Sequence, residues 1–312
     1  MNRTTFCSFT RGAIARRSWL AMLAALPLFA CGSSAAAERG RKDFAVGEPM
    51  FSTLREYYAG DYRRPHFDAL VKFYGSPENL EKAARYDAAK STAFVAVPAG
   101  WGRGKRGWGL YLHVSPADTG YLPPGWAAVL AREKLIGLSP HGIGNDADVL
   151  LRTRVALDAM AAARREFNLD ADRVFVGGFS GGGAVAARLV VEFPEFCRGA
   201  VVACKALPLR DVPAAGGFYP GEYATVPDAT WDTLRGFGRR WYFGTGTKDF
   251  NHASVTAQAP IWRALALEIE TEVVPNLDHR DLPAASLKKA LAFLQAPPAG
   301  GGAAGPAPGT EP

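Results

Sequence analysis

A single serine is surrounded by glycines in the segment VFVGGFSGGGAVAARLV, residues 174–190. The residues before the serine are β-branched or aromatic, as in a strand, and those after it are alanine-rich and amphipathic, as in a helix. A sharp strand-to-helix turn strains its corner residue and leaves room only for small neighbours, which explains the Gly-x-Ser-x-Gly pattern. The turn presents the Ser180 hydroxyl at a helix N-terminus, where free N–H groups favour negative charge. The pattern predicts a nucleophilic serine, with the Gly181 N–H stabilising an oxyanion.

A serine hydroxyl needs a general base, and the base needs an acid to orient it. The segment WYFGTGTKDFN predicts a strand, a glycine loop and then Asp249. The segment TEVVPNLDHRDLP predicts a last strand and a loop that carries His279 ahead of a C-terminal helix. We therefore expect Asp249 to orient His279, which acts first as general base and then as general acid.

Other residues compete for these roles. Asp228 or Asp232 could supply the acid from the loop at 207–240. Asp278 is the sequence neighbour of the predicted histidine, but neighbours on a loop usually point apart, and a salt link to the following arginine is its simpler role. His252 does not follow the last strand, so we expect it at the pocket rim or the surface.

The arrangement of the chain around these residues predicts an α/β fold. From Ser91 onward strand-like and helix-like runs alternate, and continuous apolar strands such as RVFVG are typical of a parallel sheet buried on both faces. The run at 146–167 has apolar residues at helical spacing. Residues 38–90 predict a mixture of helix and loop packed outside the sheet, and 207–240 predicts a loop insertion in a single domain spanning 91–295.

With these motifs the chain resembles the α/β-hydrolase superfamily of serine esterases, and within it proteins related to polyhydroxybutyrate depolymerases and feruloyl esterases. The resemblance covers about residues 91–295 and rests on the order of elements, on RVFVGGFSGGGAVAARLV, on GTKD and on the histidine of HRDLP. It implies a mostly parallel sheet flanked by helices and triad residues in the order serine, acid, histidine. It also implies that Asp249 is the acid.

The second oxyanion donor is expected in the loop after the strand GLYLHV. Many relatives have His-Gly there, whereas this chain has His113, Val114 and Ser115. We predict the N–H of Val114 or Ser115, because a main-chain donor does not require a particular side chain. The segment HGIGN at 141–145 follows another strand and predicts a glycine-rich turn near the pocket.

The insertion at 207–240 leaves the carboxyl end of a strand, the side on which open α/β sheets bind ligands. Its aromatic residues either wall a pocket for an acyl or phenolic group or pack the loop down. With no separate lid domain in the sequence, we expect a small or medium ester rather than a long-chain lipid. The predicted pocket residues are Phe179, Phe218, Tyr219, Tyr223 and Trp231.

The first 31 residues predict an export signal, because four arginines precede an apolar run, 19–30, that is too short to span a bilayer. The segment RRSWLA resembles a twin-arginine signal. The segment LFAC followed by GSS resembles the lipobox of bacterial lipoproteins, with Cys31 as the acylated first residue of the mature chain. The alternative is cleavage after residues 35–37, giving a periplasmic or secreted protein.

The composition and charge of the chain exclude several other classes of function. The chain has 312 residues, is 48% hydrophobic and carries a net charge of +6, which falls to +2 without the four signal arginines. The sequence has no lysine-rich run of the kind that would indicate nucleic-acid binding. The histidines lack metal-ligand spacing, so no metal or cofactor is implied. Cys197 and Cys204 predict two buried thiols rather than a bridge. The Pro, Gly and Ala tail at 296–312 predicts disorder.

These features together predict an exported serine hydrolase that cleaves carboxylic esters through an acyl-enzyme. An acyltransferase or a peptidase on the same fold would use the same residues. A catalytically silent binding protein at the cell surface is the rival from another class, although such a protein has no need of Ser180, Asp249 and His279 together. The sequence does not predict an oligomeric state.

Overall fold

The computed structural model describes residues 39–102, 107–205, 207–214, 217–219, 221–223 and 226–297. The chain divides into two units, Met1–Ala35 and Ala36–Pro312. The first unit, with the expected export signal and Cys31, lies outside the described residues, as does the tail from 298 onward. Within the described ranges, none of the helices has the length and apolar character needed to cross a bilayer.

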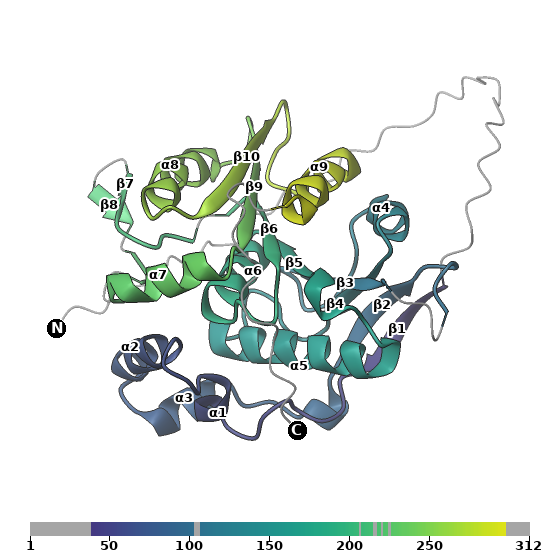
Figure 1. Ribbon diagram of the computed structural model, residues 1–312, viewed down its shortest axis with the longest axis horizontal. Helices are drawn as coiled ribbons and strands as arrows, with labels where there is room; N and C mark the ends of the chain where they lie inside the picture. Colours follow the sequence, from purple (N-terminus) through teal and green to yellow (C-terminus); the bar gives the residue numbers. More distant parts are fainter. Residues whose placement is uncertain are drawn as a thin grey trace, which may run out of the picture. The chain divides into compact units, whose positions relative to one another are not determined.

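An eight-stranded sheet in the order β1-β2-β4-β3-β5-β6-β9-β10 forms the centre of the second unit (Figure 1). The strands β1 and β2 run antiparallel to their neighbours, and the six from β4 to β10 are mutually parallel. This confirms the predicted mostly parallel sheet. The strands are β1 (Arg39–Ala45), β2 (Thr92–Val97), β3 (Gly109–Val114), β4 (Leu135–Pro140), β5 (Val174–Phe179), β6 (Gly199–Ala203), β9 (Arg240–Gly246) and β10 (Glu268–Val274).

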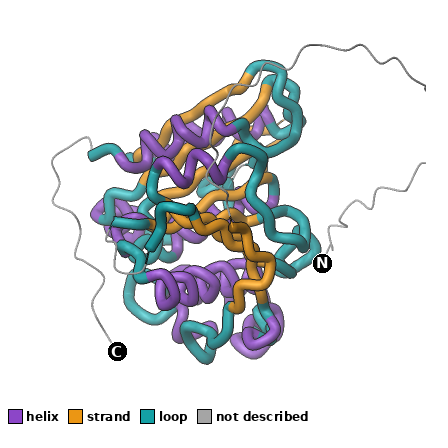
Figure 2. The backbone as a smooth tube through the Cα atoms, turned by 90° about the vertical axis from the view of Figure 1, so that its right-hand side faces the viewer, coloured by secondary structure: helices purple, strands orange, loops and turns teal. Residues whose placement is uncertain are grey.

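Helices cover both faces of this sheet, and the tube in Figure 2 shows the strands between them. The helices α5 (Val149–Phe167), α6 (Gly181–Glu192) and α8 (His252–Ala264) contribute to one core cluster, and α4 (Trp126–Arg132) and α9 (Ala284–Gln295) contribute to the other. Along β3, Leu110 and Leu112 belong to the first cluster and Tyr111 to the second. Burial on both faces is why these strands are continuously apolar in sequence.

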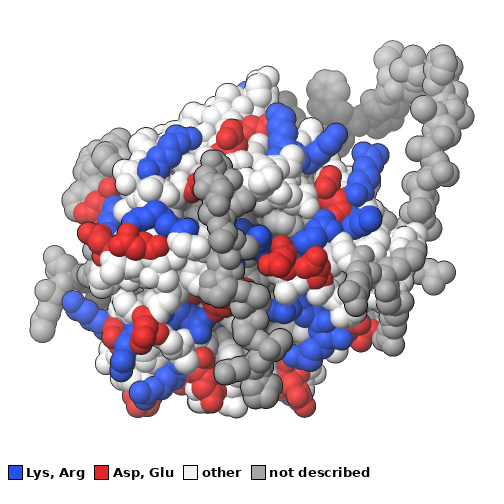
Figure 3. All heavy atoms as spheres, viewed as in Figure 1, with Lys and Arg blue, Asp and Glu red and all other residues white. Residues whose placement is uncertain are grey.

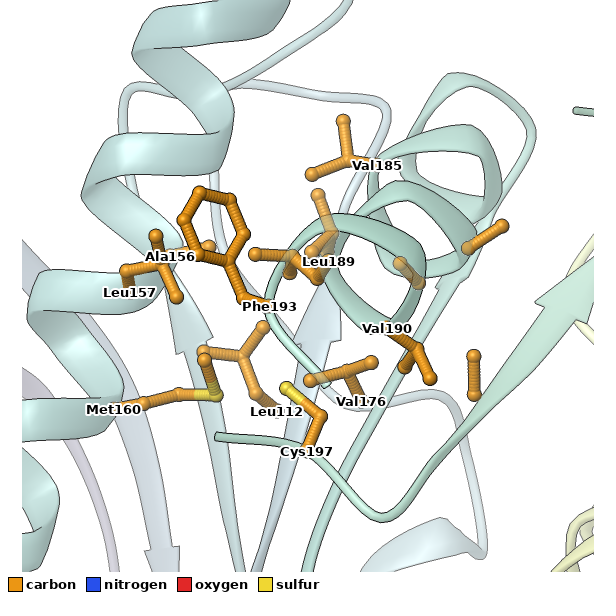
Figure 4. Close-up of a cluster of buried hydrophobic side chains, with 14 of the residues drawn as sticks. Leu112, Ala156, Leu157, Met160, Val176, Val185, Leu189, Val190, Phe193 and Cys197 are labelled. Atoms are coloured by element: carbon orange, nitrogen blue, oxygen red, sulfur yellow. The ribbon is translucent and has the colours of Figure 1, made fainter. Parts of the chain in front are cut away.

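The helix α6 is fixed by its packing between α5 and the sheet. Figure 4 shows Leu189 and Phe193 facing α5 residues, and Val190 above the strand residue Val176. Every residue from Val185 to Glu192 is buried. Because the helix is held along most of its length, the residue that precedes it is held as well.

The expectation for residues 38–90 is wrong at its start, where β1 joins the sheet. This strand pairs antiparallel with β2 at the sheet edge. An edge strand needs no continuous apolar run, and RGRKDFA is mostly charged, so the hydrophobic pattern gives no signal. The rest of the segment is helical, as expected: α1 (Leu54–Tyr57), α2 (Arg64–Tyr74), α3 (Pro77–Ala83) and the 3-10 turn η1 (Ala88–Lys90).

The insertion at 207–240 also differs from the expected loop, because it contains regular structure. A hairpin of β7 (Val212–Ala214) and β8 (Gly217–Tyr219) is followed by the helix α7 (Asp228–Gly236). The helix buries Thr230, Trp231 and Leu234, which share one face at helical spacing. The turn η2 (Ala171–Arg173) completes the described elements.

Charges of both signs are interspersed on the face shown in Figure 3. The ion pairs of the described residues include Arg63 with Glu195 and Lys289 with Glu272 at 2.5 Å. This mixture agrees with the nearly balanced charge of the chain without its first 31 residues.

Candidate active site

Ser180 occupies the corner between β5 and α6 in a strained backbone conformation. Its φ is 54° and its ψ is −126°, a region that residues other than glycine rarely adopt. Its N–H donates to the Ala203 carbonyl at 2.9 Å, and its carbonyl accepts from the Gly183 N–H at 2.9 Å. A Cβ atom at Gly178 would lie 2.3 Å from the Gly182 carbonyl oxygen. The glycines around the serine are therefore required by close backbone contact.

A chain of hydrogen bonds links three side chains that the sequence separates widely. His279 Nε2 lies 3.0 Å from Ser180 Oγ, and His279 Nδ1 lies 2.8 Å from Asp249 Oδ1. The serine follows β5, the aspartate follows β9 and the histidine follows β10, and the carboxyl ends of these parallel strands share one edge of the sheet. This geometry allows the histidine to take the serine proton while the carboxylate orients the ring.

Asp249 is held as an ionised hydrogen-bond acceptor. Burial alone would raise its pKa, but hydrogen bonds from Thr245, the Asn251 N–H, His279 and Cys204 together hold the pKa of this carboxyl below its usual value. Thr245 Oγ1 donates to Oδ2 at 2.7 Å, and the Asn251 N–H donates to Oδ1 at 3.0 Å. Asp249 therefore carries a negative charge at neutral pH.

The alternative acids are engaged elsewhere. The Asp228 carboxylate lies 2.9 Å from Arg210, and Asp232 pairs with Arg235 on the same helix. Asp278 binds Arg280 through two hydrogen bonds, as its simpler interpretation predicts.

His252, the alternative histidine, is the first residue of α8. Its side chain is half-buried. Of the two histidines, His279 is the one whose ring forms a hydrogen bond with the Asp249 carboxylate.

The loop that carries His279 is held by hydrogen bonds from two aromatic side chains. Trp126 Nε1 donates to the Leu282 carbonyl at 2.9 Å, and the Tyr121 hydroxyl donates to Asp281. His113 is fully buried, its Nε2 lies 3.5 Å from Asp281 Oδ1, and burial lowers its pKa to about 3. A neutral His113 thus packs beneath the loop.

The end of β3 lies directly beside the serine corner. A Cβ atom at Gly182 would lie 1.9 Å from the Val114 carbonyl oxygen. The next residue, Ser115, is buried, and its Oγ accepts from the Ala117 N–H at 3.0 Å. The first N–H groups of a helix have no intrahelical partner, which suits Gly181 for the first donor. The second donor, Val114 or Ser115, stays a prediction.

The HGIGN turn borders the same corner. The Asn145 N–H donates to the Pro116 carbonyl at 2.8 Å, which ties this turn to the loop after β3. A Cβ atom at Gly181 would lie 2.1 Å from Asn145 Oδ1 and 3.1 Å from Arg152 Nη1. Sequence reasoning did not single out Asn145 or Arg152. The sequence offers no distinct signal for Arg152, because the same helix also buries Arg154 and Asp158.

Two aromatic rings flank the histidine. The Phe179 and His279 ring centroids are 4.8 Å apart, and the Phe250 and His279 centroids are 4.0 Å apart. Phe250 is 77% exposed, so its ring faces solvent beside the histidine. Phe179 was among the predicted pocket residues, whereas Phe250 was missed although it directly follows Asp249.

The other predicted pocket aromatics lie elsewhere. Tyr223 donates to Glu192 at 2.7 Å, and Trp231 is 1% exposed and packs edge-on against Tyr223. Glu192 ends α6, about 16 Å from its first residue at 1.5 Å per residue. This favours packing over a pocket role for both residues. The side chains of Phe218 and Tyr219 lie outside the described part of the structure.

Cys204, Asp249 and His279 offer three ligand atoms within 4.8 Å of one another. Two ligand atoms at about 2.1 Å from a tetrahedral zinc would lie roughly 3.4 Å apart, whereas the His279 and Asp249 atoms are 2.8 Å apart. That distance fits a shared proton. Burial and the nearby Asp249 carboxylate raise the pKa of the Cys204 thiol. Cys197 and Cys204 are both free and buried, which confirms the prediction for the two thiols.

No family model and no curated protein matches this sequence. Among solved structures, the Staphylococcus aureus fluorophosphonate-binding serine hydrolase FphF is similar over 66% of this chain and 92% of its own, with a TM-score of 0.50 and 12% identity. A ferulic acid esterase is similar over 66% and 92%, with a TM-score of 0.49 and 14% identity. An esterase of Pyrobaculum calidifontis is similar over 77% and 97%, with a TM-score of 0.48 and 14% identity. At such low identity the similarity concerns the fold alone. Together with the strand order, it identifies an α/β-hydrolase fold.

Proposed function

We propose that this protein is a serine hydrolase that cleaves carboxylic esters through a covalent acyl-enzyme. The observation that carries the proposal is the continuous hydrogen-bonded chain from Ser180 Oγ through His279 to Asp249 at a strained strand-to-helix corner. A structural serine would need neither the strain nor a buried, ionised carboxylate behind its histidine.

The geometry defines a role for each group. His279 Nε2 takes the Ser180 proton as Oγ attacks the ester carbonyl carbon, and Asp249 stabilises the imidazolium that forms. The carbonyl oxygen becomes an oxyanion at the N-terminus of α6, beside the Gly181 N–H. His279 then gives its proton to the departing alkoxide. Water repeats the sequence on the acyl-enzyme, which releases the carboxylic acid and restores the Ser180 hydroxyl.

The substrate we propose is a small or medium ester. Phe179 and Phe250 offer apolar surface on both sides of His279, and the exposed Phe250 ring can pack against an acyl or alcohol group that enters from solvent.

We also propose that the protein is exported, with Cys31 as its acylated first residue. This part rests on residues 1–31 alone. Mass spectrometry of the protein from a bacterial envelope should find an acylated N-terminus at Cys31, whereas an unmodified N-terminus at Glu38 would indicate simple signal cleavage.

A fluorophosphonate probe tests the proposed chemistry. It should label the protein at Ser180, and Ser180→Ala should abolish labelling. His279→Ala and Asp249→Asn should each lower kcat for a short-chain ester by roughly 10³-fold or more, because triad members act as a unit. His252→Ala and Asp228→Asn are matched controls that should stay near wild type.

Three results would count against the proposal. One is labelling that persists in Ser180→Ala, and another is an Asp249→Asn enzyme with normal kcat. The third is a folded protein that neither reacts with the probe nor cleaves esters, which would favour the silent binding protein. Product analysis with an added alcohol acceptor separates hydrolysis from acyl transfer.

A further inference from the structure

Arg152 lies in the first turns of α5 and is only 5% exposed. Its Nε donates to the Ile143 carbonyl at 2.9 Å, and its Nη2 donates to the Ser115 carbonyl at 3.3 Å. These bonds connect the turn after β4 to the loop after β3, and both segments border the serine corner. Among the described residues, the third nitrogen, Nη1, has no hydrogen-bond partner.

Three of the five buried arginines in the described part of the chain have a carboxylate partner. Arg154 lies 3.8 Å from Glu81, Arg188 lies 2.8 Å from Glu192, and Arg240 lies 2.6 Å from Glu268. Arg152 forms no ion pair with any described residue, and burial lowers its pKa to about 10. It therefore keeps its charge at neutral pH without a counter-ion, an arrangement that costs free energy unless a ligand supplies one.

The free nitrogen points at the start of α6. A Cβ atom at Gly181 would lie 3.1 Å from Nη1. Gly181 and Ser180 are both partly exposed and Asn145 is exposed, so a molecule bound at Ser180 can reach this point. The guanidinium adds its charge to the positive end of a 12-residue helix.

We propose that Arg152 binds a carboxylate carried by the ester substrate itself, a few bonds from the carbonyl that Ser180 attacks. The short separation follows from the geometry, because Nη1 lies beside Gly181 and consecutive Cα atoms are about 3.8 Å apart. Arginine suits this role since its guanidinium forms charge-assisted hydrogen bonds with carboxylates. The inference rests on the proposed ester hydrolysis and specifies its substrate class, an ester with an anionic group on either its acyl or its alcohol side.

Two pairs of soluble esters test the charge and its side. On the acyl side, monomethyl succinate carries the carboxylate and dimethyl succinate does not. On the alcohol side, acetoxyacetate carries it and 2-methoxyethyl acetate does not. Alkaline hydrolysis of the same four esters gives the intrinsic reactivities. Relative to these, the wild-type enzyme should prefer the charged member of one pair by about tenfold or more in kcat/KM, and that pair identifies the side.

The variant Arg152→Met should remove this preference. It should lower kcat/KM for the charged ester by about tenfold or more while changing the neutral ester by less than about threefold, and Arg152→Lys should retain part of the preference. Arg239→Met is the matched control, because Arg239 is also buried without an ion pair but precedes β9, at the opposite edge of the sheet. It should keep the wild-type preference.

Two results would overturn this inference while leaving the proposed function intact. The first is a wild-type enzyme that is labelled at Ser180 and cleaves both pairs of esters without preferring the charged member. This measurement on the wild type alone would be decisive. The second is an Arg152→Met enzyme that loses equal activity on charged and neutral esters, which would show that Arg152 only supports the two loops. A protein that is not labelled and cleaves none of the esters would instead fail the proposed function.

Discussion

The two ends of α6 differ in how the buried arginine beside each end is paired. At the carboxyl end, Arg188 pairs with Glu192 at 2.8 Å and also with Glu222. Glu192 accepts further hydrogen bonds from Tyr58 at 2.5 Å and Tyr223 at 2.7 Å. At the amino end, the acceptors of Arg152 among the described residues are two main-chain carbonyls.

We infer that the polar groups at the carboxyl end of α6 stabilise the fold, whereas those at its amino end are available to a ligand. The carboxyl-end network is buried except for Glu222, and its arginine pairs with both carboxylates. It therefore fixes how the N-terminal helices and the insertion pack on the core. The amino end combines a strained serine, free helix N–H groups and a buried cation without a counter-ion among the described residues, and Ser180 and Gly181 there are partly exposed. We infer that a bound molecule supplies the partners that these groups lack.

The largest effect is expected from breaking the carboxyl-end network. Arg188→Met leaves Glu192, which is 1% exposed, without its cation. Because an unpaired buried charge is strongly destabilising, we expect the free energy of unfolding to fall by about 3–5 kcal/mol. Urea denaturation measures this loss, and kcat per folded molecule should stay near wild type.

The double variant Arg188→Met, Glu192→Gln is the control for this prediction. Removing both charges should restore much of the lost stability, since the buried carboxylate is gone. A single variant with full stability, or one that loses kcat at unchanged stability, would contradict the structural role assigned to this end of the helix.

Much of the site was predictable from sequence because its residues follow strands. Ser180, Asp249 and His279 each lie within a few residues of the end of a segment with a clear strand pattern, and parallel strands bring their carboxyl ends to one edge. Close backbone contact at Gly178 and Gly182 requires glycine, so it can be recognised in the sequence, whereas a contact between side chains cannot. Local pattern and topology together were sufficient for these positions.

The features that sequence missed depend on contacts between distant segments. The edge strand β1 lacks an apolar run, and Trp231 could be assigned to a pocket or to the core only once α7 was placed against Tyr223. Arg152 looked like any helical arginine until Gly181 and Ser115 were placed around it. Aromatic and charged residues are compatible with both core and site, so their roles follow from the fold.

A second prediction concerns His113, a fully buried titratable group at the same sheet edge as the site. Burial lowers its pKa to about 3 from an ordinary value of 6.5. Below pH 6.5 the unfolded chain binds a proton here that the folded chain does not. The free energy of unfolding should therefore fall as pH decreases from 6.5 towards 3, by up to about 1.4 kcal/mol per pH unit.

Urea denaturation of wild type and His113→Asn at pH 7 and pH 5 isolates this contribution. The variant should lose less stability between the two pH values, by roughly 2 kcal/mol. Burial also lowers the pKa of His66, which remains in the variant, so its contribution cancels in the comparison. Burial raises the pKa of Asp281, which lies 3.5 Å from His113, so the same comparison is repeated with Asp281→Asn in both proteins. Equal losses in the two proteins would show that His113 is protonated when folded, and would weaken the contrast between a neutral buried group and the charged Arg152.

The smallest effect is expected from removing a hydrogen bond that holds the Asp249 carboxylate in place behind His279. Thr245 is buried and donates to Asp249 Oδ2 at 2.7 Å, a bond that helps to keep the carboxylate ionised and fixed in orientation. Thr245→Val keeps the shape and removes the donor, so the remaining burial raises the pKa of Asp249 and the ring of His279 is held less firmly. A hydrogen bond to a charged group contributes about 1.5 kcal/mol or somewhat more, which corresponds to roughly a tenfold loss in kcat for a neutral ester. Thr245→Ser retains the hydroxyl and should recover most of this activity, whereas a purely structural role would make Ser, which lacks the methyl group, the more damaging change. Wild-type kcat in Thr245→Val would mean that the Asn251 N–H and Cys204 suffice to hold the carboxylate in place.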